Sequence, residues 1–310
     1  MPRRRTRRIV LTAALAAVAL VVGGCGLGPG PGPRDARLDV TRDFGTAQIG
    51  SVVEKRVPGQ ETVMQMLQRH FKVATGYGGG FVNGIAGNER SDHDDWFYYV
   101  NGIEAPKGAA ETNVHDGDRI WWDLHNWSVT DSIPAVVGSY PEPFLSGIAG
   151  RRYPTLVTCA DQTAAACQLV ASSLHRAGVK VSFQAFGTGS GSDSLAVIVG
   201  TLKQIEGVIA AELLSAGPKT SGVYAQNVGT SAIELEDPSG KVVQTLRAGA
   251  GLVAATEQVS LGVPAWIVTG TDTAGVDAAA RAFTQTALRH HFALAVDGSR
   301  TIPVPVVAER

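Results

Sequence analysis

The sequence has 310 residues, and 44% of them are hydrophobic, which is enough for one large or two ordinary folded domains. The first 24 residues carry five arginines; without them, 22 basic and 28 acidic side chains remain, a net charge of −6. An acidic body of this kind argues against nucleic acid as a partner.

The first residues have the pattern of a bacterial export signal. Arginines precede a weakly polar stretch, Ile9 to Val22, that is shorter than the roughly 20 residues a membrane span needs. The stretch ends in Val22-Gly23-Gly24-Cys25, which resembles the bacterial lipobox. We therefore expect residues 1–24 to be a lipoprotein signal peptide and Cys25 to carry lipid. This predicts a protein anchored to the extracytoplasmic face of the cell membrane; the alternative is an ordinary signal peptide or a short anchor.

Glycine and proline alternate after Cys25, and both residues interrupt helices and strands. We interpret residues 25–37 as a spacer and residues 38–130 as a small α+β module. Alternating apolar residues around Val52 predict a strand. The apolar spacing from Thr62 to Val73 then predicts a helix with one buried face.

Aromatic residues gather in the next two predicted strands, Trp96–Val100 and Ile120–Trp127, and Asn101-Gly102 is a strong hairpin-turn signal. Alternation along a strand places Trp96, Tyr98 and Trp122 on one face of the sheet. We interpret this face as a platform for a flat ligand; the alternative is an aromatic core face. The candidate ligand-binding residues are Tyr77, Trp96, Tyr98, Asn101 and Trp122.

Residues 131–154 are rich in glycine and proline and are interpreted as a connector, and residues 155–310 as an α/β domain of repeated strand–helix units. Strands are predicted at 155–158, 179–186, 195–200, 265–270 and 292–296, helices at 164–177, 202–214 and 273–290, and a hairpin at 233–246. The predicted fold class is thus α+β, with a small β-grasp-like domain followed by an α/β domain.

Two cysteines remain once Cys25 is assigned to lipid. Cys159 and Cys167 form an even pair in an oxidising location, so we predict a disulfide between them; the alternative is two buried free cysteines. Their spacing is not that of a zinc site.

Enzyme signatures are missing from the sequence. No serine nucleophile elbow, phosphate-binding loop or dinucleotide fingerprint is present, and the polar run Ser91–Asp95 lacks the spacing of a metal-binding loop. We therefore expect no enzymatic activity, no metal and no resident cofactor.

One part of the chain resembles a known family. A helix near the start, Gly-Gly-Phe-Val-x-x-Ile-x-Gly from Gly79 to Gly87, Trp96 to Gly102, and Asp116-Gly-Asp118 before a tryptophan-rich strand look like the transcobalamin-type C-terminal β domain. The resemblance covers residues 48–128. In animal cobalamin carriers that domain closes over one face of the corrinoid beside a helical barrel, which this chain lacks.

This resemblance implies an extracytoplasmic protein that captures a ligand, with cobalamin or another corrinoid as the candidate, for an uptake transporter or a helical-barrel partner. The alternative is a cell-surface lipoprotein that binds other proteins and has no small-molecule ligand. An envelope enzyme is a third reading.

Overall fold

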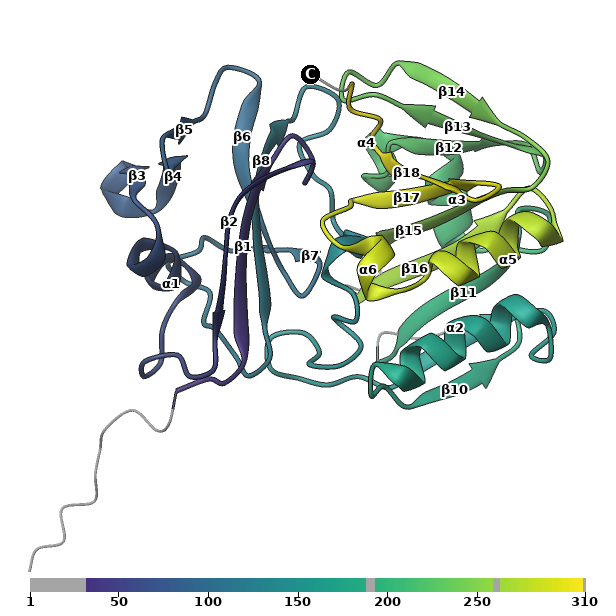
Figure 1. Ribbon diagram of the computed structural model, residues 1–310, viewed down its shortest axis with the longest axis horizontal. Helices are drawn as coiled ribbons and strands as arrows, with labels where there is room; N and C mark the ends of the chain where they lie inside the picture. The colour runs from purple at the N-terminus through teal and green to yellow at the C-terminus, as the bar shows by residue number, and fades with distance from the viewer. Residues whose placement is uncertain (1–31, 188–192, 259–262, 309–310) are drawn as a thin grey trace, which may run out of the picture.

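Strands dominate the structure, and they form two main sheets that stand beside each other (Figure 1). The computed structural model describes residues 32–187, 193–258 and 263–308. Helices pack on both sheets, which confirms the predicted α+β class. Cys25 and the predicted signal peptide lie outside the described residues, so their assignment stays a prediction.

The first sheet has the strand order β2-β1-β8-β6-β7, with β1 and β8 parallel and the other neighbours antiparallel. Its strands are β1 (Ala36–Arg42), β2 (Ala47–Glu54), β6 (Asp94–Val100), β7 (Ile103–Glu104) and β8 (Arg119–Asn126). Because β1 begins at Ala36, the folded body starts inside the stretch predicted as spacer.

Helix α1 (Val63–His70) covers one face of this sheet. It begins at Thr62, whose hydroxyl accepts a hydrogen bond from the Gln65 N–H while the Gln65 side chain accepts one from the Thr62 N–H. This reciprocal cap satisfies two backbone donors that a helix start leaves open. The buried side of α1 carries Val63, Met66 and Leu67, which pack on Trp96, Tyr98 and Trp122 of the sheet.

A smaller sheet extends the first module on the α1 side (Figure 1). Its strands are β3 (Val73–Gly76), β4 (Phe81–Ile85) and β5 (Asn88–Glu89), and the short 3-10 helix η1 (Tyr77–Gly79) joins the first two.

The second main sheet has the order β10-β9-β11-β16-β15-β17-β18; the first four strands are parallel, and β15, β17 and β18 are antiparallel to their neighbours. Its strands are β9 (Thr155–Cys159), β10 (Val181–Gln184), β11 (Leu195–Thr201), β15 (Ala250–Gln258), β16 (Val263–Gly270), β17 (Ala293–Asp297) and β18 (Arg300–Val304). Alternating strands and helices explain the parallel half, because parallel neighbours need a crossover connection.

Helices cover the two faces of this sheet differently. On one face lie α2 (Ala165–Arg176) and α5 (Thr273–Ala282), which share a core with β9, β11 and β16. On the other face lie α3 (Ile209–Ser215) and the three-stranded sheet β12 (Ala225–Val228), β13 (Ala232–Glu236) and β14 (Val242–Leu246). Two further short α-helices are α4 (Pro218–Ser221) and α6 (Gln285–Leu288), and the connector contains the 3-10 helix η2 (Val137–Ser139).

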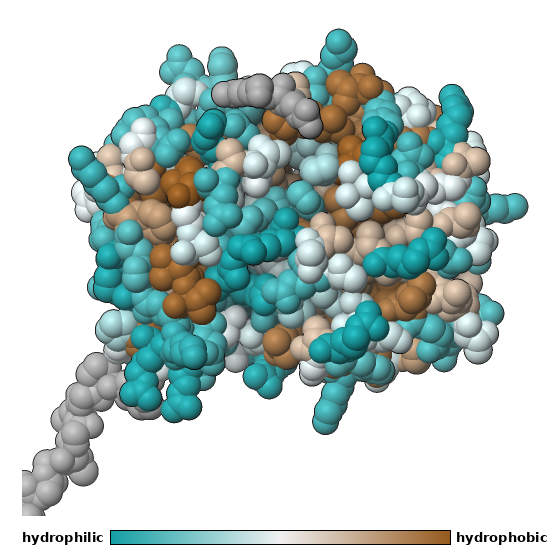
Figure 2. Space-filling view, viewed as in Figure 1, coloured by the Kyte–Doolittle hydropathy of each residue, from teal (hydrophilic) through white to brown (hydrophobic). Residues whose placement is uncertain are grey.

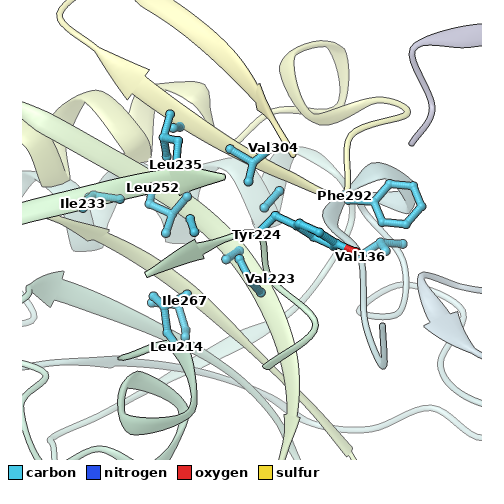
Figure 3. Close-up of a cluster of buried hydrophobic side chains, with 14 of the residues drawn as sticks. Val136, Leu214, Val223, Tyr224, Ile233, Leu235, Leu252, Ile267, Phe292 and Val304 are labelled. Carbon is cyan, nitrogen blue, oxygen red and sulfur yellow. The ribbon is translucent and has the colours of Figure 1, made fainter. Parts of the chain in front are cut away.

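The core on that second face is shared by both halves of the chain. Leu214, Ile233, Leu252 and Ile267 fill its centre, and Tyr224 and Phe292 extend it toward the connector residue Val136 (Figure 3). Phe44, Tyr99 and Trp121 of the first sheet belong to the same cluster. The two sheets are therefore joined by continuous apolar packing, and residues of the connector are buried at their junction.

Some predicted elements of the second half are wrong in extent. The helix predicted from residue 202 begins only at Ile209, because residues 201–208 form hydrogen-bonded turns. The helix predicted for 273–290 is two helices, with a break at Phe283 where Thr284 caps the second. Strand β15 was not predicted at all, although it pairs with both β16 and β17.

The predicted disulfide is present. Cys159 at the end of β9 and Cys167 in the first turns of α2 are bonded, with their Cα atoms 6.4 Å apart. Both residues are buried in the core that α2 shares with the sheet. The bond therefore fastens α2 to the strand that precedes it.

Candidate functional site

The face of the first sheet that points toward the second sheet contains ionisable side chains. Asp123 and His125 lie on β8 at the same parity as Trp121, and they are only 0% and 3% exposed. A carboxylate buried this deeply is costly unless hydrogen bonds replace its water. The hydrogen-bond partners of this carboxylate therefore identify the groups that it holds in place.

Asp123 accepts four hydrogen bonds. The Thr41 hydroxyl donates to Oδ2 at 2.5 Å, and the backbone N–H groups of Phe44 and Gly45 donate to Oδ1 and Oδ2 at 3.1 and 2.8 Å. The fourth bond, 2.9 Å long, joins Oδ1 to Nδ1 of His125. The carboxylate thus fixes both the turn after β1 and the orientation of the imidazole.

Aromatic rings from both halves of the chain enclose the imidazole of His125. Phe97 stacks on it with ring centroids 4.5 Å apart, and Phe44 lies 4.7 Å away. Phe292, which precedes β17, meets the same ring edge-on at 5.2 Å. The Asp123–His125 pair is therefore part of the contact between the two sheets.

A cavity of about 400 Å³ lies above this network, where the two halves of the chain meet. We call it the junction cavity. Its lining comes from the turn after β1, the ends of β6 and β8, the β13–β14 turn and the C-terminal segment: Asp43, Phe44, Asp94, Asn126, Ser128, Val129, Pro238, Ser239 and Val307. Phe44 links the cavity to the buried pair, because the same residue lines the cavity and contacts His125.

The lining of the junction cavity combines carboxylates, an amide and hydroxyls with a few apolar side chains. Two carboxylates and no basic side chain line it, so it suits a neutral or cationic polar group. Hydrophilic residues also gather in the middle of the face shown in Figure 2, between the two parts of the molecule. The cavity volume falls within the range of small-molecule sites in proteins, about 300–1,000 Å³.

Further ionisable groups lie at the junction, away from the cavity. Burial lowers the pKa of His291 to about 4, and the neighbouring His290 contributes to this shift. Burial alone would raise the pKa of Asp39, but hydrogen bonds from His290, Arg37 and Ser51 outweigh it and hold that pKa well below its usual range. Near neutral pH, Asp39 is therefore ionised and His291 is neutral.

The predicted aromatic platform is wrong as an open surface. Trp96, Tyr98 and Trp122 do share one face of the sheet, as the alternation predicted, but α1 covers that face and buries all three rings. Tyr98 stacks on Trp122 with centroids 4.7 Å apart, and its hydroxyl donates to the Lys107 carbonyl at 2.5 Å. The rings form the core of the first module.

The other two predicted site residues lie apart from each other. Asn101 is buried in the predicted hairpin turn with φ +56°, and its amide donates to Asp118 Oδ1 and to the Gly147 carbonyl. It therefore holds the turn. Tyr77 is 92% exposed at the tip between β3 and β4, where its ring meets Phe81 edge-on at 6.1 Å. The structure does not bring Tyr77 and Asn101 together with the rings.

Sequence reasoning missed Phe44, Asp123 and His125. A signal was available in β8, where Asp123 and His125 share one face of the strand with Trp121, next to a strongly apolar opposite face. Such a pattern indicates a buried polar network as well as core packing. Phe44 gave no comparable signal, because its contacts come from residues more than 50 positions away.

A second cavity, of about 230 Å³, lies at the carboxyl ends of β9, β11 and β16, beside the disulfide and the first turns of α2 and α5. Among the described residues, no three His, Cys, Asp or Glu side chains come together in a way that could hold a metal ion. Within the same ranges, no helix is long and apolar enough to cross a membrane.

Comparison with known proteins finds one family. Residues 60–126 match the family model described as a domain of unknown function, DUF4430. A solved structure from Ruminococcus gnavus, described as a candidate metal binding protein, is similar at 18% sequence identity and a TM-score of 0.25. The match covers 30% of this chain and 97% of that one. No curated protein matches the chain.

Proposed function

We propose that this chain is an extracytoplasmic, lipid-anchored binding protein that captures a small ligand at the junction between its two sheets. The observation that carries the proposal is the junction cavity, which residues from both halves of the chain line. Its polar lining over an ordered Asp123–His125 pair is the arrangement of a site that orients a ligand, since pre-formed pockets combine apolar walls with a few fixed polar groups. The proposal involves no catalytic step.

A corrinoid is the ligand class that the resemblance to the transcobalamin-type domain implies. The corrin ring is larger than the junction cavity, so the proposal places only an edge of it there. The amide side chains on that edge would donate to Asp43 and Asp94 and accept from hydroxyls such as Ser128. The Lys- and Arg-free lining fits neutral amides better than anionic groups.

Isothermal titration of the mature protein with cyanocobalamin tests this proposal. An indole placed in the cavity by Ser128→Trp should block part of the proposed site and weaken binding strongly. The matched control is Thr230→Trp, which places the same indole in another cavity of about 330 Å³, and it should bind like the parent. If cyanocobalamin gives no heat and a panel of polar metabolites raises the melting temperature of neither parent nor control, the capture function is wrong.

A second candidate function, docking on a partner protein such as an uptake transporter, is favoured by Tyr77. Its ring is almost fully exposed, and a Cβ added at Gly78 or Gly79, the next two residues, would meet no atom within 4 Å. Aromatic residues are common anchors in protein interfaces. Photo-crosslinking from position 77 in the native envelope should trap one partner; loss of the product in Tyr77→Ala, with Val53→Ala as the control, would support docking.

A further inference from the structure

We infer that the end of the first sheet at which the described chain begins lies against an anionic membrane surface, and that the junction cavity opens away from it. This inference rests on the proposed lipid at Cys25. It adds an orientation and a partner surface, the negatively charged lipid headgroups, to the proposed function.

The length of chain after Cys25 limits how far the body can stand from the membrane. Gly32 is seven positions after Cys25, and seven residues span at most about 25 Å when fully extended. Hydrogen bonds hold the chain against the body at Pro33 and Arg34. The Pro33 carbonyl accepts from Val57 N–H at 2.8 Å, and the Arg34 N–H donates to Asp116 Oδ1 at 2.7 Å.

Backbone hydrogen bonds define which residues share this end, which we call the anchor end. The Arg34 carbonyl accepts from the Gly117 N–H at 2.8 Å, and the Asp35 N–H donates to the Lys55 carbonyl at 3.3 Å. The tight turn at Gly150 adjoins His115 in the same loop region. Hydrophilic residues gather where the described chain begins (Figure 2).

The anchor end is basic, although the mature chain is acidic. Its exposed charged side chains are Arg34, Lys55, Arg56, Arg151 and Arg152 on the basic side and Asp35, Asp116 and Asp193 on the acidic side, a net charge of +2. Lysine and arginine within a Debye length of a bilayer, about 8 Å at physiological salt, are attracted by anionic headgroups. The basic side chains of the anchor end are therefore complementary to the anionic headgroups, and this is the same end that the short spacer holds near the membrane.

The junction cavity lies at the opposite end of β1. The strand runs seven residues from Ala36, beside the anchor end, to Arg42, directly before the cavity residue Asp43 (Figure 1). At 3.3 Å per residue, the seven steps from Ala36 to Asp43 span about 23 Å. A body held by the anchor end therefore presents the cavity to the medium, where a dissolved ligand arrives.

Fluorescence quenching in vesicles tests the orientation with the full lipidated chain. A fluorophore is placed at Gln60→Cys, next to the Gly59 that adjoins Gly32, or at Ser239→Cys in the cavity lining; both positions are exposed. Vesicles of phosphatidylcholine and phosphatidylglycerol carry a headgroup spin label. We expect several-fold stronger quenching at position 60 than at position 239. Equal quenching, or the reverse order, would overturn the inference.

Charge reversal separates electrostatic contact from mere tethering. Lys55→Glu with Arg56→Glu should reduce quenching at position 60, whereas Lys203→Glu with Lys219→Glu, exposed in the second half of the chain, should leave it unchanged. An equal response of both pairs would contradict the anionic surface. Cyanocobalamin titration of the samples labelled at position 60, outside the cavity lining, keeps the proposals apart: no binding with intact quenching contradicts ligand capture alone. An unlipidated Cys25 by mass spectrometry would overturn the anchor and this inference together.

Discussion

The two faces of the first sheet use the same strands for different purposes. Toward α1, the face carries Trp96, Tyr98 and Trp122 in a core made almost entirely within residues 36–124. Toward the second sheet, the neighbouring positions carry Tyr99, Trp121 and the Asp123–His125 pair, whose packing is completed by residues from the second half. On β8, the buried ionisable side chains Asp123 and His125 thus lie on the face that the chain assembles from both halves. One face is therefore a core built within the first module, and the other lies at the junction where we propose the ligand site.

Trp122→Ala should have the largest effect and sharpen this comparison most. A buried tryptophan removed from a packed core costs about 3–5 kcal/mol of unfolding free energy. Urea denaturation should show that loss, while ligand binding by the surviving folded protein stays at the parental level. Trp127→Ala is the control, because that ring is 38% exposed and should change stability little. A Trp122→Ala protein of parental stability would break the assignment of this face as core.

Asp123→Asn should have an intermediate effect on the opposite face. The amide has a single acceptor oxygen, so one of the two backbone donors, the Phe44 N–H on Oδ1 or the Gly45 N–H on Oδ2, loses its acceptor. The charge that orients His125 is also lost, and the cost should be about 1–3 kcal/mol. Unlike Trp122→Ala, this variant should also weaken ligand binding, because the Phe44 turn lines the cavity. Unchanged ligand affinity in Asp123→Asn would show that the network is structural only.

Acid should weaken the junction through His291. Its folded pKa of about 4 lies below its ordinary value of 6.5, so the native state holds fewer protons and its stability is complete above pH 6.5. Stability should fall as the pH drops toward 4, with a loss of about 1–2 kcal/mol at pH 5. Denaturation of His291→Gln between pH 7 and 5 should give a flatter profile than the parent. The exposed His93→Gln variant should keep the parental slope.

Tyr77→Ala should have the smallest effect on stability, within about 0.5 kcal/mol, because the ring is almost fully exposed and meets Phe81 only at its edge. Thermal melting of this variant checks it. A large drop in the melting temperature would mean that Tyr77 belongs to the core of the first module. It would contradict the distinction between the exposed β3–β4 tip and the buried aromatic face.

Local chemistry in the sequence predicted the elements well where side-chain period and turn residues agree. The parity of Trp96, Tyr98 and Trp122, the Asn101-Gly102 turn and the Cys159–Cys167 disulfide all follow from neighbours in sequence. The sequence did not predict that α1 covers the aromatic face. The alternation of side chains along a strand shows which residues share a face, but it does not show on which face a helix packs. The cavity joins turns at residues 43, 128 and 239, and only the tertiary fold brings such distant turns together.

Hydrogen–deuterium exchange with and without cyanocobalamin tests the central claim, that the junction between the sheets is the ligand site, most directly. We predict slower exchange on ligand addition in peptides that contain Phe44, Ser128 and Ser239, and unchanged exchange in α1 and β3–β5. Protection confined to the α1 side, or binding with no protection at these three turns, would contradict the account.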